Sequence, residues 1–486
     1  MRTSRAFPVL AAAAVAAAWL PFLRAPLTPD EGGFLLLGKQ WAPGTSLYGH
    51  YWVDRPPLII WLFSLCDSPS AVRLLGLTAA ALTVLLSGVL ARALAPTSRW
   101  VAGAAPLLAA VLVTSPMFGM TETDGELLAL PLVMTGLVCV IAALRSDGAW
   151  PLLATAVAAG AFATAGAMVK QSIIDVFVFA VVAFLCSWRH IDRKATRAAS
   201  FIGGSLVVLA VCVGIASARG TSPAELWNAV VTFRFDAAKV IGATTPHAIS
   251  DRLTREIGAF VASGAAAILG TTLWALWRGR RRLEPSVARL APAAAAMVTW
   301  ELVVVALGGS YWLHYLIGLI PGLVVLVALA GQLVRARTVL TACFVLAIAG
   351  NTAAWVYRQV NPPVLLEYDA RVASYLRSHA DPADGVVVAF GHPNIVQASG
   401  LRSPYADLWK LPVRVHDPDL AKFRALISRP TGPRWLVVDV DPRESWRLDE
   451  RAGHLALREH YLVRARSGPW RVLERDGSAR SEITPG

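Results

Sequence analysis

The sequence predicts an α-helical polytopic membrane protein with about eleven transmembrane helices, followed by a small C-terminal extracytoplasmic α/β domain. Three observations lead to this fold class. Of the 486 residues, 56% are hydrophobic and only 16% are charged, and the mean hydropathy is +0.54. Apolar stretches near the spanning length of about 20 residues recur along most of the chain. The basic residues lie between alternate stretches, whereas a nucleic-acid-binding protein would gather them in one patch.

Hydropathy alone defines the predicted membrane-spanning segments. They cover residues 7–23, 70–91, 100–118, 126–144, 149–168, 171–188, 199–218, 257–277, 290–308, 313–333 and 338–357. The first segment could instead be a signal peptide, because Arg2 and Arg5 precede an alanine-rich apolar run. An uncleaved helix is the simpler interpretation, since many spans follow it.

The basic residues predict the orientation of these spans. When all eleven spans are counted, the basic clusters between them fall on one side, which marks that side as cytoplasmic. The clusters are Arg2 and Arg5; Arg92 and Arg99; Arg145; Arg189, Arg193, Lys194 and Arg197; Arg278, Arg280, Arg281, Arg282 and Arg289; and Arg335 and Arg337. We therefore expect a protein of the cell membrane with a cytoplasmic N-terminus, and an external loop around Asp30.

Two outer loops are long. The first, residues 24–69, contains an apolar piece at Leu58–Leu65 that is too short to cross the bilayer and is predicted to form an interfacial or re-entrant helix. The second, residues 219–256, carries an amphipathic stretch from Glu225 to Val240. Helices that lie along the interface can wall a cavity between bilayer and water.

Hydropathy falls after about Asn361, so we predict a membrane domain at residues 1–360 and a soluble domain at 361–486. In the second domain, Leu365–His379 has helical periodicity. Short apolar runs bounded by Gly, Pro and Asp predict strands at Val386–Phe390, Trp435–Val440, Tyr461–Val463 and Trp470–Leu473. A small α/β domain outside the membrane is the expected result.

Charged residues gather at the outer ends of the predicted spans. They come from six separate segments: Asp30 and Glu31; Asp54 and Arg55; Glu122, Asp124 and Glu126; Lys170; Arg234, Lys239, Arg252 and Arg255; and His314. Charges near hydrocarbon are costly to keep, so such residues are by default candidates for a functional site. We predict that they border one external pocket.

Each of these residues also has a structural alternative. Glu126 could be a first-turn acid favoured by the helix dipole, and Lys170 could extend along the membrane boundary with its ammonium in water. Arg55 could anchor the interface, and His314 with its aromatic neighbours could belong to an interfacial belt. The carboxylates Asp30 and Glu31 could lie in a solvated loop.

A carboxylate and several cations at the edge of a bilayer suit sugar transfer from a polyprenyl-phosphate carrier. The lipid tail of such a donor lies in the membrane, and its phosphate lies at headgroup level. Cations would stabilise the charge that develops on the departing phosphate. One carboxylate would accept the proton of the acceptor hydroxyl.

Several motifs resemble the GT-C membrane glycosyltransferases, in the branch of the protein O-mannosyltransferases and the lipid A aminoarabinose transferases. The similar motifs are Asp30-Glu31-Gly32-Gly33-Phe34, Gly44-Thr45-Ser46-Leu47-Tyr48, Asp54-Arg55-Pro56-Pro57-Leu58, Glu126-Leu127-Leu128, Lys170-Gln171 and His314-Tyr315-Leu316 to Pro321-Gly322. The resemblance covers most of the first 330 residues. It implies that Asp30 is the catalytic base, that Glu126 occupies a second acidic position, and that Arg55 and Lys170 contact the donor phosphate.

Arg55 departs from this pattern, because lysine is usual before the Pro-Pro pair. The substitution keeps the charge but changes the hydrogen-bond geometry. The resemblance further implies inverting chemistry on polyprenyl-phosphate sugars without a nucleotide cofactor, and it leaves metal dependence open. The five cysteines indicate neither a metal cluster nor a disulfide framework.

The sequence therefore predicts an inverting glycosyltransferase that moves a sugar from a polyprenyl-phosphate donor to a protein, glycan or lipid outside the cytoplasm. Asp30, Glu31 and Glu126 form the predicted catalytic set, and Arg55, Lys170 and Arg234 the phosphate-binding set. Asp54, Asp124 and His314 are placed at the periphery, with no residue assigned to a metal. The alternative function is a transporter or flippase of lipid-linked sugars, which would show internal symmetry or interrupted helices; neither is evident in the sequence.

Overall fold

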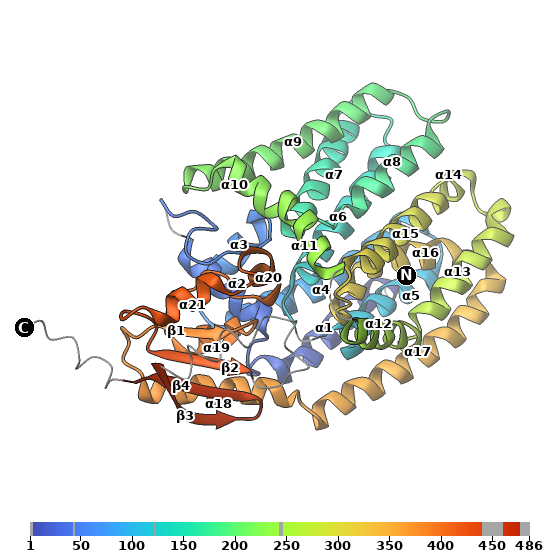
Figure 1. Cartoon of the computed structure of the whole chain (residues 1–486). Helices are drawn as coiled ribbons and strands as arrows, with labels where there is room; N and C mark the ends of the chain where they lie inside the picture. The colour runs from blue at the N-terminus through green and yellow to red at the C-terminus, as the bar shows by residue number, and fades with distance from the viewer. Residues whose placement is uncertain (1–2, 42–43, 121, 243–245, 440–459, 477–486) are drawn as a thin grey trace, which may run out of the picture.

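The computed structural model describes residues 3–41, 44–120, 122–242, 246–439 and 460–476, so predictions that concern Arg2 and Val440 lie outside the described residues (Figure 1). Each predicted span corresponds to a helix. These helices are α1 (Thr3–Trp19), α4 (Pro69–Leu94), α5 (Arg99–Val113), α6 (Gly125–Arg145), α7 (Ala149–Val169), α8 (Asp175–Ser187), α9 (Lys194–Ala218), α13 (Ala265–Gly279), α15 (Ala291–Gly308), α16 (Leu319–Ala330) and α17 (Val334–Val360).

The protein is a multi-pass membrane protein, although the predicted number of eleven spans stays a prediction. In the described part of the chain, seven helices are long and apolar enough to cross a bilayer by length and composition, or eight if one bent pair counts as a single span. The helices around residues 6–22, 99–113 and 175–187 are apolar but shorter. Helices as short as these need local thinning of the bilayer or adjoining turns to reach both surfaces.

Side-chain caps and small residues explain how the helices begin and pack. The Ser68 hydroxyl accepts a hydrogen bond from the Ala71 N–H at the start of α4, which satisfies a donor that the helix cannot. Helices α7 and α9 approach closely at Gly160 and Gly204, where a Cβ atom on either glycine would overlap the backbone of the other helix. Small residues commonly allow such contact between helices in membranes.

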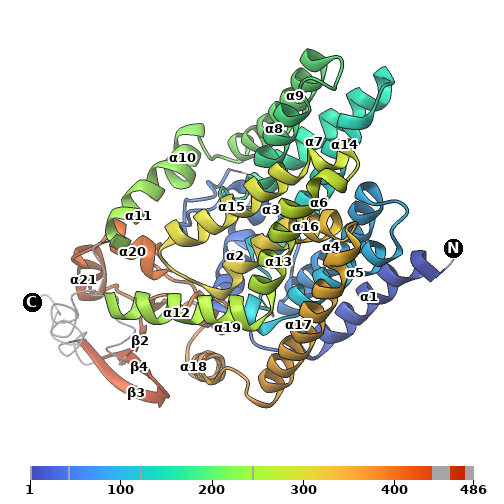
Figure 2. The ribbon, with the colours of Figure 1, turned by 90° about the vertical axis from the view of Figure 1, so that its right-hand side faces the viewer.

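The predicted span at residues 257–277 is not one straight helix. Helix α12 (Pro246–Ala262) and helix α13 form a pair that is bent by 61°, and Figure 2 shows α12 running across the direction of α13. Gly264 adopts a φ of +80° at the break, and the Asn351 amide donates to the Ser263 carbonyl at 2.9 Å. The chain therefore contains an interrupted helix that hydropathy did not reveal, because an apolar run continues through the bend.

The first of the two long loops is more helical than predicted. Its apolar piece forms α3 (Pro57–Ser64), as expected, but Asp30 and Glu31 begin a helix of their own, α2 (Pro29–Gln40). The second loop forms α10 (Pro223–Trp227), a π-helical turn η3 (Asn228–Thr232) and α11 (Phe233–Gly242). Both loops lie beside the C-terminal region in Figure 1.

Within residues 364–439 and 460–476, the C-terminal region forms a four-stranded mixed sheet in the order β1-β2-β4-β3. Its elements are α18 (Val364–His379), β1 (Val386–Ala389), α19 (Pro393–Ser399), α20 (Lys410–His416), α21 (Ala421–Ser428), β2 (Trp435–Asp439), β3 (Tyr461–Ser467) and β4 (Trp470–Arg475). Strands β1 and β2 are parallel, and the other pairs are antiparallel. Val386 and Val388 join one apolar cluster while Val387 joins another, so alternate side chains of β1 serve both faces of the sheet.

Candidate active site

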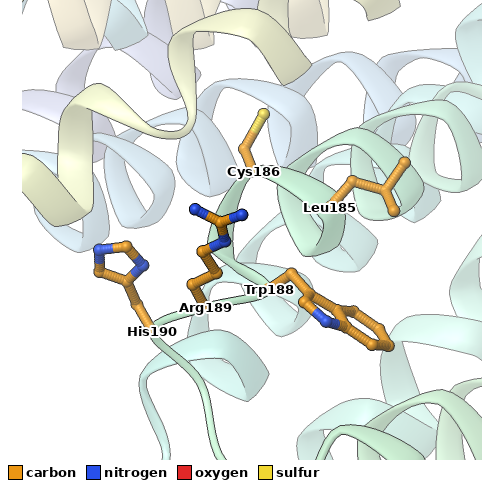
Figure 3. A pocket seen from close by; sticks show the side chains of 5 residues that line it. All are labelled: Leu185, Cys186, Trp188, Arg189 and His190. Atoms are coloured by element: carbon orange, nitrogen blue, oxygen red, sulfur yellow. The ribbon is translucent and has the colours of Figure 1, made fainter.

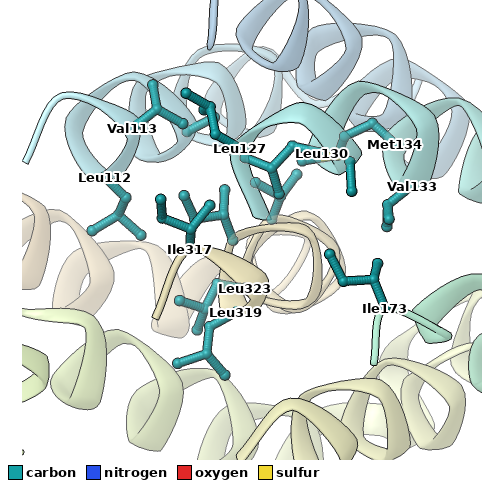
Figure 4. Close-up of a cluster of buried hydrophobic side chains, with 14 of the residues drawn as sticks. Leu112, Val113, Leu127, Leu130, Val133, Met134, Ile173, Ile317, Leu319 and Leu323 are labelled. Atoms are coloured by element: carbon teal, nitrogen blue, oxygen red, sulfur yellow. The ribbon is translucent and has the colours of Figure 1, made fainter. Parts of the chain in front are cut away.

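The candidate site lies where the first loop, the α5–α6 connection, the α7–α8 connection and the turn η5 (Leu313–Gly318) meet. A cluster of buried apolar side chains beneath it connects α6, η5, α16 and the α7–α8 connection (Figure 4). Each of three charged residues is followed closely by a member of this cluster: Glu126 by Leu127, Lys170 by Ile173, and His314 by Ile317. Packing in the apolar layer thus positions charges from segments that are distant in sequence.

Asp30 lies in the first turn of α2, which begins at the N-cap residue Thr28. One oxygen of its carboxylate, Oδ1, accepts a hydrogen bond from the indole Nε1 of Trp409 at 2.8 Å. Burial raises the pKa of the Asp30 carboxyl, and this effect outweighs the opposing effects of Arg55 and His314. A carboxylate with a raised pKa is a stronger proton acceptor than an exposed one, as a general base requires.

Glu31 points into the protein, which corrects its predicted place in the catalytic set. Its side chain is fully buried and forms an ion pair with Arg73 at 3.0 Å. The same carboxylate accepts hydrogen bonds from the backbone N–H groups of Thr28 at 2.9 Å and Thr123 at 2.7 Å. Consecutive residues of a helix point in different directions, and protein groups already engage both oxygens of the fully buried Glu31 carboxylate. We assign Glu31 a structural role.

Replacing Glu31 by Gln is expected to lower the free energy of unfolding by about 3–5 kcal/mol, because the Arg73 guanidinium would stay buried without its counter-charge. Chemical unfolding in bicelles would measure the loss. Glu225→Gln is the matched control, since Glu225 forms the same kind of capping box with Ser222 on the exposed helix α10. If both variants were equally stable, the structural role of Glu31 would be wrong.

Asp54 and two arginines form a second group of charges. The Asp54 carboxylate contacts Arg55 at 2.7 Å and Arg234 at 2.9 Å. Although burial opposes ionisation, Arg234 and Arg55 hold the pKa of Asp54 below its usual range. The Arg55 guanidinium lies over the Phe34 ring, 5.9 Å from its centroid. Asp54 therefore orients both cations toward the same region, and Arg234 joins the site from a loop that is distant in sequence.

Lys170 forms an ion pair with Glu126, and both side chains are largely buried. Its ammonium also lies over the Tyr315 ring, 4.4 Å from the centroid, where a cation is attracted to the π electrons. Lys170 therefore does not extend to open water, as the alternative of a boundary lysine required. Glu126 is likewise more than a first-turn acid, because its carboxylate contacts a cation from another connection.

His314 lies among two acids. Its Nδ1 atom is 3.3 Å from Glu122 and 3.9 Å from Asp124, and Asp124 also caps α6 by accepting from the Leu127 N–H at 2.8 Å. The donor atoms of Glu122, Asp124 and His314 lie within 4.8 Å of one another. Two carboxylates and an imidazole suit a divalent transition metal, so these residues could hold a metal ion that the sequence analysis did not assign.

Two site residues were not assigned to the site from sequence. Trp409 comes from the C-terminal region, outside the motifs of the first 330 residues that indicated the site. Tyr315 was grouped with an interfacial belt. The Gly32-Gly33 pair that follows Asp30-Glu31 is the sequence feature that indicates a close neighbour such as Trp409. A Cβ atom on Gly33 would overlap the Trp409 ring.

Comparison with known proteins shows the fold. The sequence matches none of the family models and none of the curated proteins with which it was compared. Among solved structures, ArnT from Cupriavidus metallidurans in the apo state is similar over 98% of this chain and 99% of its own, with a TM-score of 0.64 and 15% identity. ArnT bound to undecaprenyl phosphate gives a TM-score of 0.61 at 15% identity and the same coverage. The chain has the GT-C fold.

A more distant structure has the same GT-C fold. The Archaeoglobus fulgidus oligosaccharyltransferase in complex with Zn and sulfate is similar over 94% of this chain and 72% of its own, with a TM-score of 0.56 and 11% identity. At these identities the likeness concerns the arrangement of helices and the C-terminal region. It does not by itself assign a role to any residue.

A hollow of about 420 Å³ lies elsewhere in the GT-C fold, at the end of α8 opposite to Lys170. Leu185, Cys186, Trp188, Arg189 and His190 line it, and Figure 3 shows these side chains around the turn that follows α8. No acid is among these lining residues, so this hollow is not the candidate site for sugar transfer.

Proposed function

We propose that this protein is an inverting glycosyltransferase that moves a sugar from a polyprenyl-phosphate donor to a protein, glycan or lipid acceptor outside the cytoplasm. The observation that carries the proposal is the meeting of a partly buried carboxylate, Asp30, with the guanidinium of Arg55, which lies over the Phe34 ring of the same helix α2. The charge of Arg55 opposes the rise in the pKa of Asp30 that burial causes. The GT-C fold supports it, since similar structures are described with undecaprenyl phosphate and dolichol-phosphate.

In the proposed reaction the acceptor hydroxyl oxygen attacks C1 of the sugar on the face opposite the phosphate. The bond between C1 and the phosphate oxygen breaks, and its electron pair leaves with the polyprenyl phosphate. The hydroxyl proton passes to Asp30, which acts as general base. A single displacement of this kind inverts the configuration at C1.

Arg55 and Lys170, with Arg234 beside Asp54, would stabilise the phosphate. One guanidinium carries five N–H donors and one ammonium carries three, so each cation can contact phosphate while it keeps its acid partner. Glu126 would hold Lys170 in place. Glu122, Asp124 and His314 would hold a divalent cation if one binds, and that ion would supply further positive charge near the phosphate.

The proposal includes the predicted organisation of the chain. Residues 1–360 would form the membrane glycosyltransferase domain and residues 361–486 an extracytoplasmic domain. The N-terminus would be cytoplasmic, and the donor would enter laterally from the cell membrane while the acceptor arrives from water. No nucleotide or nucleic acid takes part.

Incubation of the purified protein with a labelled polyprenyl-phosphate sugar and membrane extract as acceptor should release unsubstituted polyprenyl phosphate and label the acceptor fraction. Thin-layer chromatography would measure both products. A transporter would instead move the intact donor across the bilayer of a proteoliposome without releasing lipid phosphate. That outcome would replace the glycosyltransferase proposal with the alternative function.

A further inference from the structure

The C-terminal region lies directly on the helix that carries Asp30. Gly32 and Gly33 form the contact surface, because a Cβ atom at Gly32 would overlap the Asn394 backbone and one at Gly33 would overlap the Trp409 ring. The Asn394 amide donates to the Leu27 carbonyl just before α2, at 3.2 Å. The two glycines after Asp30-Glu31 therefore allow this region to approach closely.

Trp409 makes the contact that reaches the carboxylate. It immediately precedes α20, and its ring lies 5.9 Å from the Phe34 ring on α2. Its indole N–H donates to Asp30 Oδ1 at 2.8 Å. Among the described residues, Trp409 is the side-chain hydrogen-bond donor to Asp30, so the second oxygen, Oδ2, is left for another donor.

The segment that carries Trp409 is itself held on both sides. The Trp52 N–H of the first loop donates to the Ala406 carbonyl at 3.0 Å, and the Gly391 N–H donates to the Leu408 carbonyl at 3.1 Å. The Ser403 N–H donates to the Tyr51 hydroxyl at 2.9 Å. On the other side, the Val413 N–H donates to the Trp409 carbonyl at 3.2 Å. Backbone contacts before and at Trp409 thus hold the segment that presents its indole to Asp30.

We propose that Trp409 is a positioning residue for sugar transfer: its indole N–H holds Oδ1 of Asp30 so that Oδ2 faces the acceptor hydroxyl. The C-terminal region would then form part of the active site. This inference rests on the proposed function, since it assumes that Asp30 is the base. Correct placement of a reacting group can change a rate by about 100-fold for a displacement of about 1 Å.

The hydrogen bond also affects ionisation. The groups that act on Asp30 are Arg55 from the first loop, Glu122 from the α5–α6 connection, His314 and Tyr315 from η5, and Trp409. Burial raises the pKa of Asp30, while the indole N–H lowers it by favouring the charged form. Loss of the N–H should therefore raise the pKa, and activity should be lost at a higher pH as the solution is acidified.

Trp409→Phe tests this inference, because phenylalanine keeps an aromatic ring on Phe34 and removes the donor. We expect kcat to fall by about 10- to 100-fold with little change in the KM for donor, and the acidic limb of the kcat/KM profile to move to higher pH. Trp435→Phe is the matched control. Trp435 is a buried tryptophan of the same region, and its indole N–H donates to Asp384 at 3.0 Å rather than to Asp30.

The possible results separate the two proposals. If Trp409→Phe and Trp435→Phe were equally active with the same pH profile, the positioning role would be overturned while the glycosyltransferase proposal stood. If only Trp409→Ala lost activity, packing rather than the N–H would be responsible, and the inference would again be wrong. If Asp30→Asn kept its activity, the proposed base itself would be wrong. Thermal melting of every variant would show that folded protein was compared.

Discussion

Replacement of Asp30 by Asn is expected to lower the rate of sugar transfer by about 10²–10⁴-fold, the usual contribution of a general base. The amide is nearly the same size as the carboxylate and can still accept the Trp409 hydrogen bond through its oxygen. It cannot accept the proton of the acceptor hydroxyl at neutral pH. Turnover of labelled donor by wild type and variant at equal protein concentration would measure the loss.

The matched control for this change is Asp236→Asn. Asp236 is an exposed acid on α11 that pairs with Lys239, and its loss should leave turnover within about twofold, as expected for an exposed surface ion pair. The Asp30→Asn variant should still bind the donor, since the cationic side chains proposed to hold the donor phosphate are unchanged. Turnover by this variant near the wild-type rate would remove Asp30 from the mechanism.

Replacement of Lys170 by Met is expected to lower kcat by about 10²–10³-fold, in line with the removal of one stabilising group from a charged transition state. The side chain is largely buried against Glu126 and Tyr315, where a charge interacts more strongly than it does in water. Single-turnover measurements with labelled donor would report the chemical step, and equilibrium binding of polyprenyl phosphate would report the ground state.

The single variant leaves Glu126 without its partner, so a second variant separates charge loss from misfolding. Lys170→Met combined with Glu126→Gln removes both charges and should fold better than the single variant, yet it should remain as slow. Lys239 was among the charges predicted to border the pocket, but its side chain is exposed and pairs with Asp236 on α11. Lys239→Met is therefore the surface control. Recovery of full activity in the double variant would show that Lys170 only neutralises Glu126.

The apolar segments were predictable because each must satisfy its own backbone hydrogen bonds within the bilayer. Hydropathy therefore located a helix for every predicted span, and short apolar runs bounded by Gly, Pro and Asp located the strands of the C-terminal region. Hydropathy did not locate the 61° bend between α12 and α13, since the bend depends on one glycine conformation and on a hydrogen bond from Asn351. Neither feature changes the mean hydropathy of a sequence window.

The candidate site was predictable in its members but not in its contacts. Asp30, Arg55, Glu126 and Lys170 were candidates because they are charged and lie at the predicted outer ends of spans. A charged group near hydrocarbon is costly and is usually kept for a function or paired with another charge. The ion pair between Lys170 and Glu126 could not be predicted from the sequence. It arises where two connections of the helical bundle meet.

The sequence by itself determined that this chain enters the membrane many times and collects charge at the ends of its apolar segments, because transfer of apolar and charged groups between water and lipid depends on composition. Tertiary structure alone decided which of two adjacent acids faces the site. Helix α2 directs Asp30 toward Trp409 and Glu31 toward Arg73, and that direction depends on packing between segments about 380 positions apart.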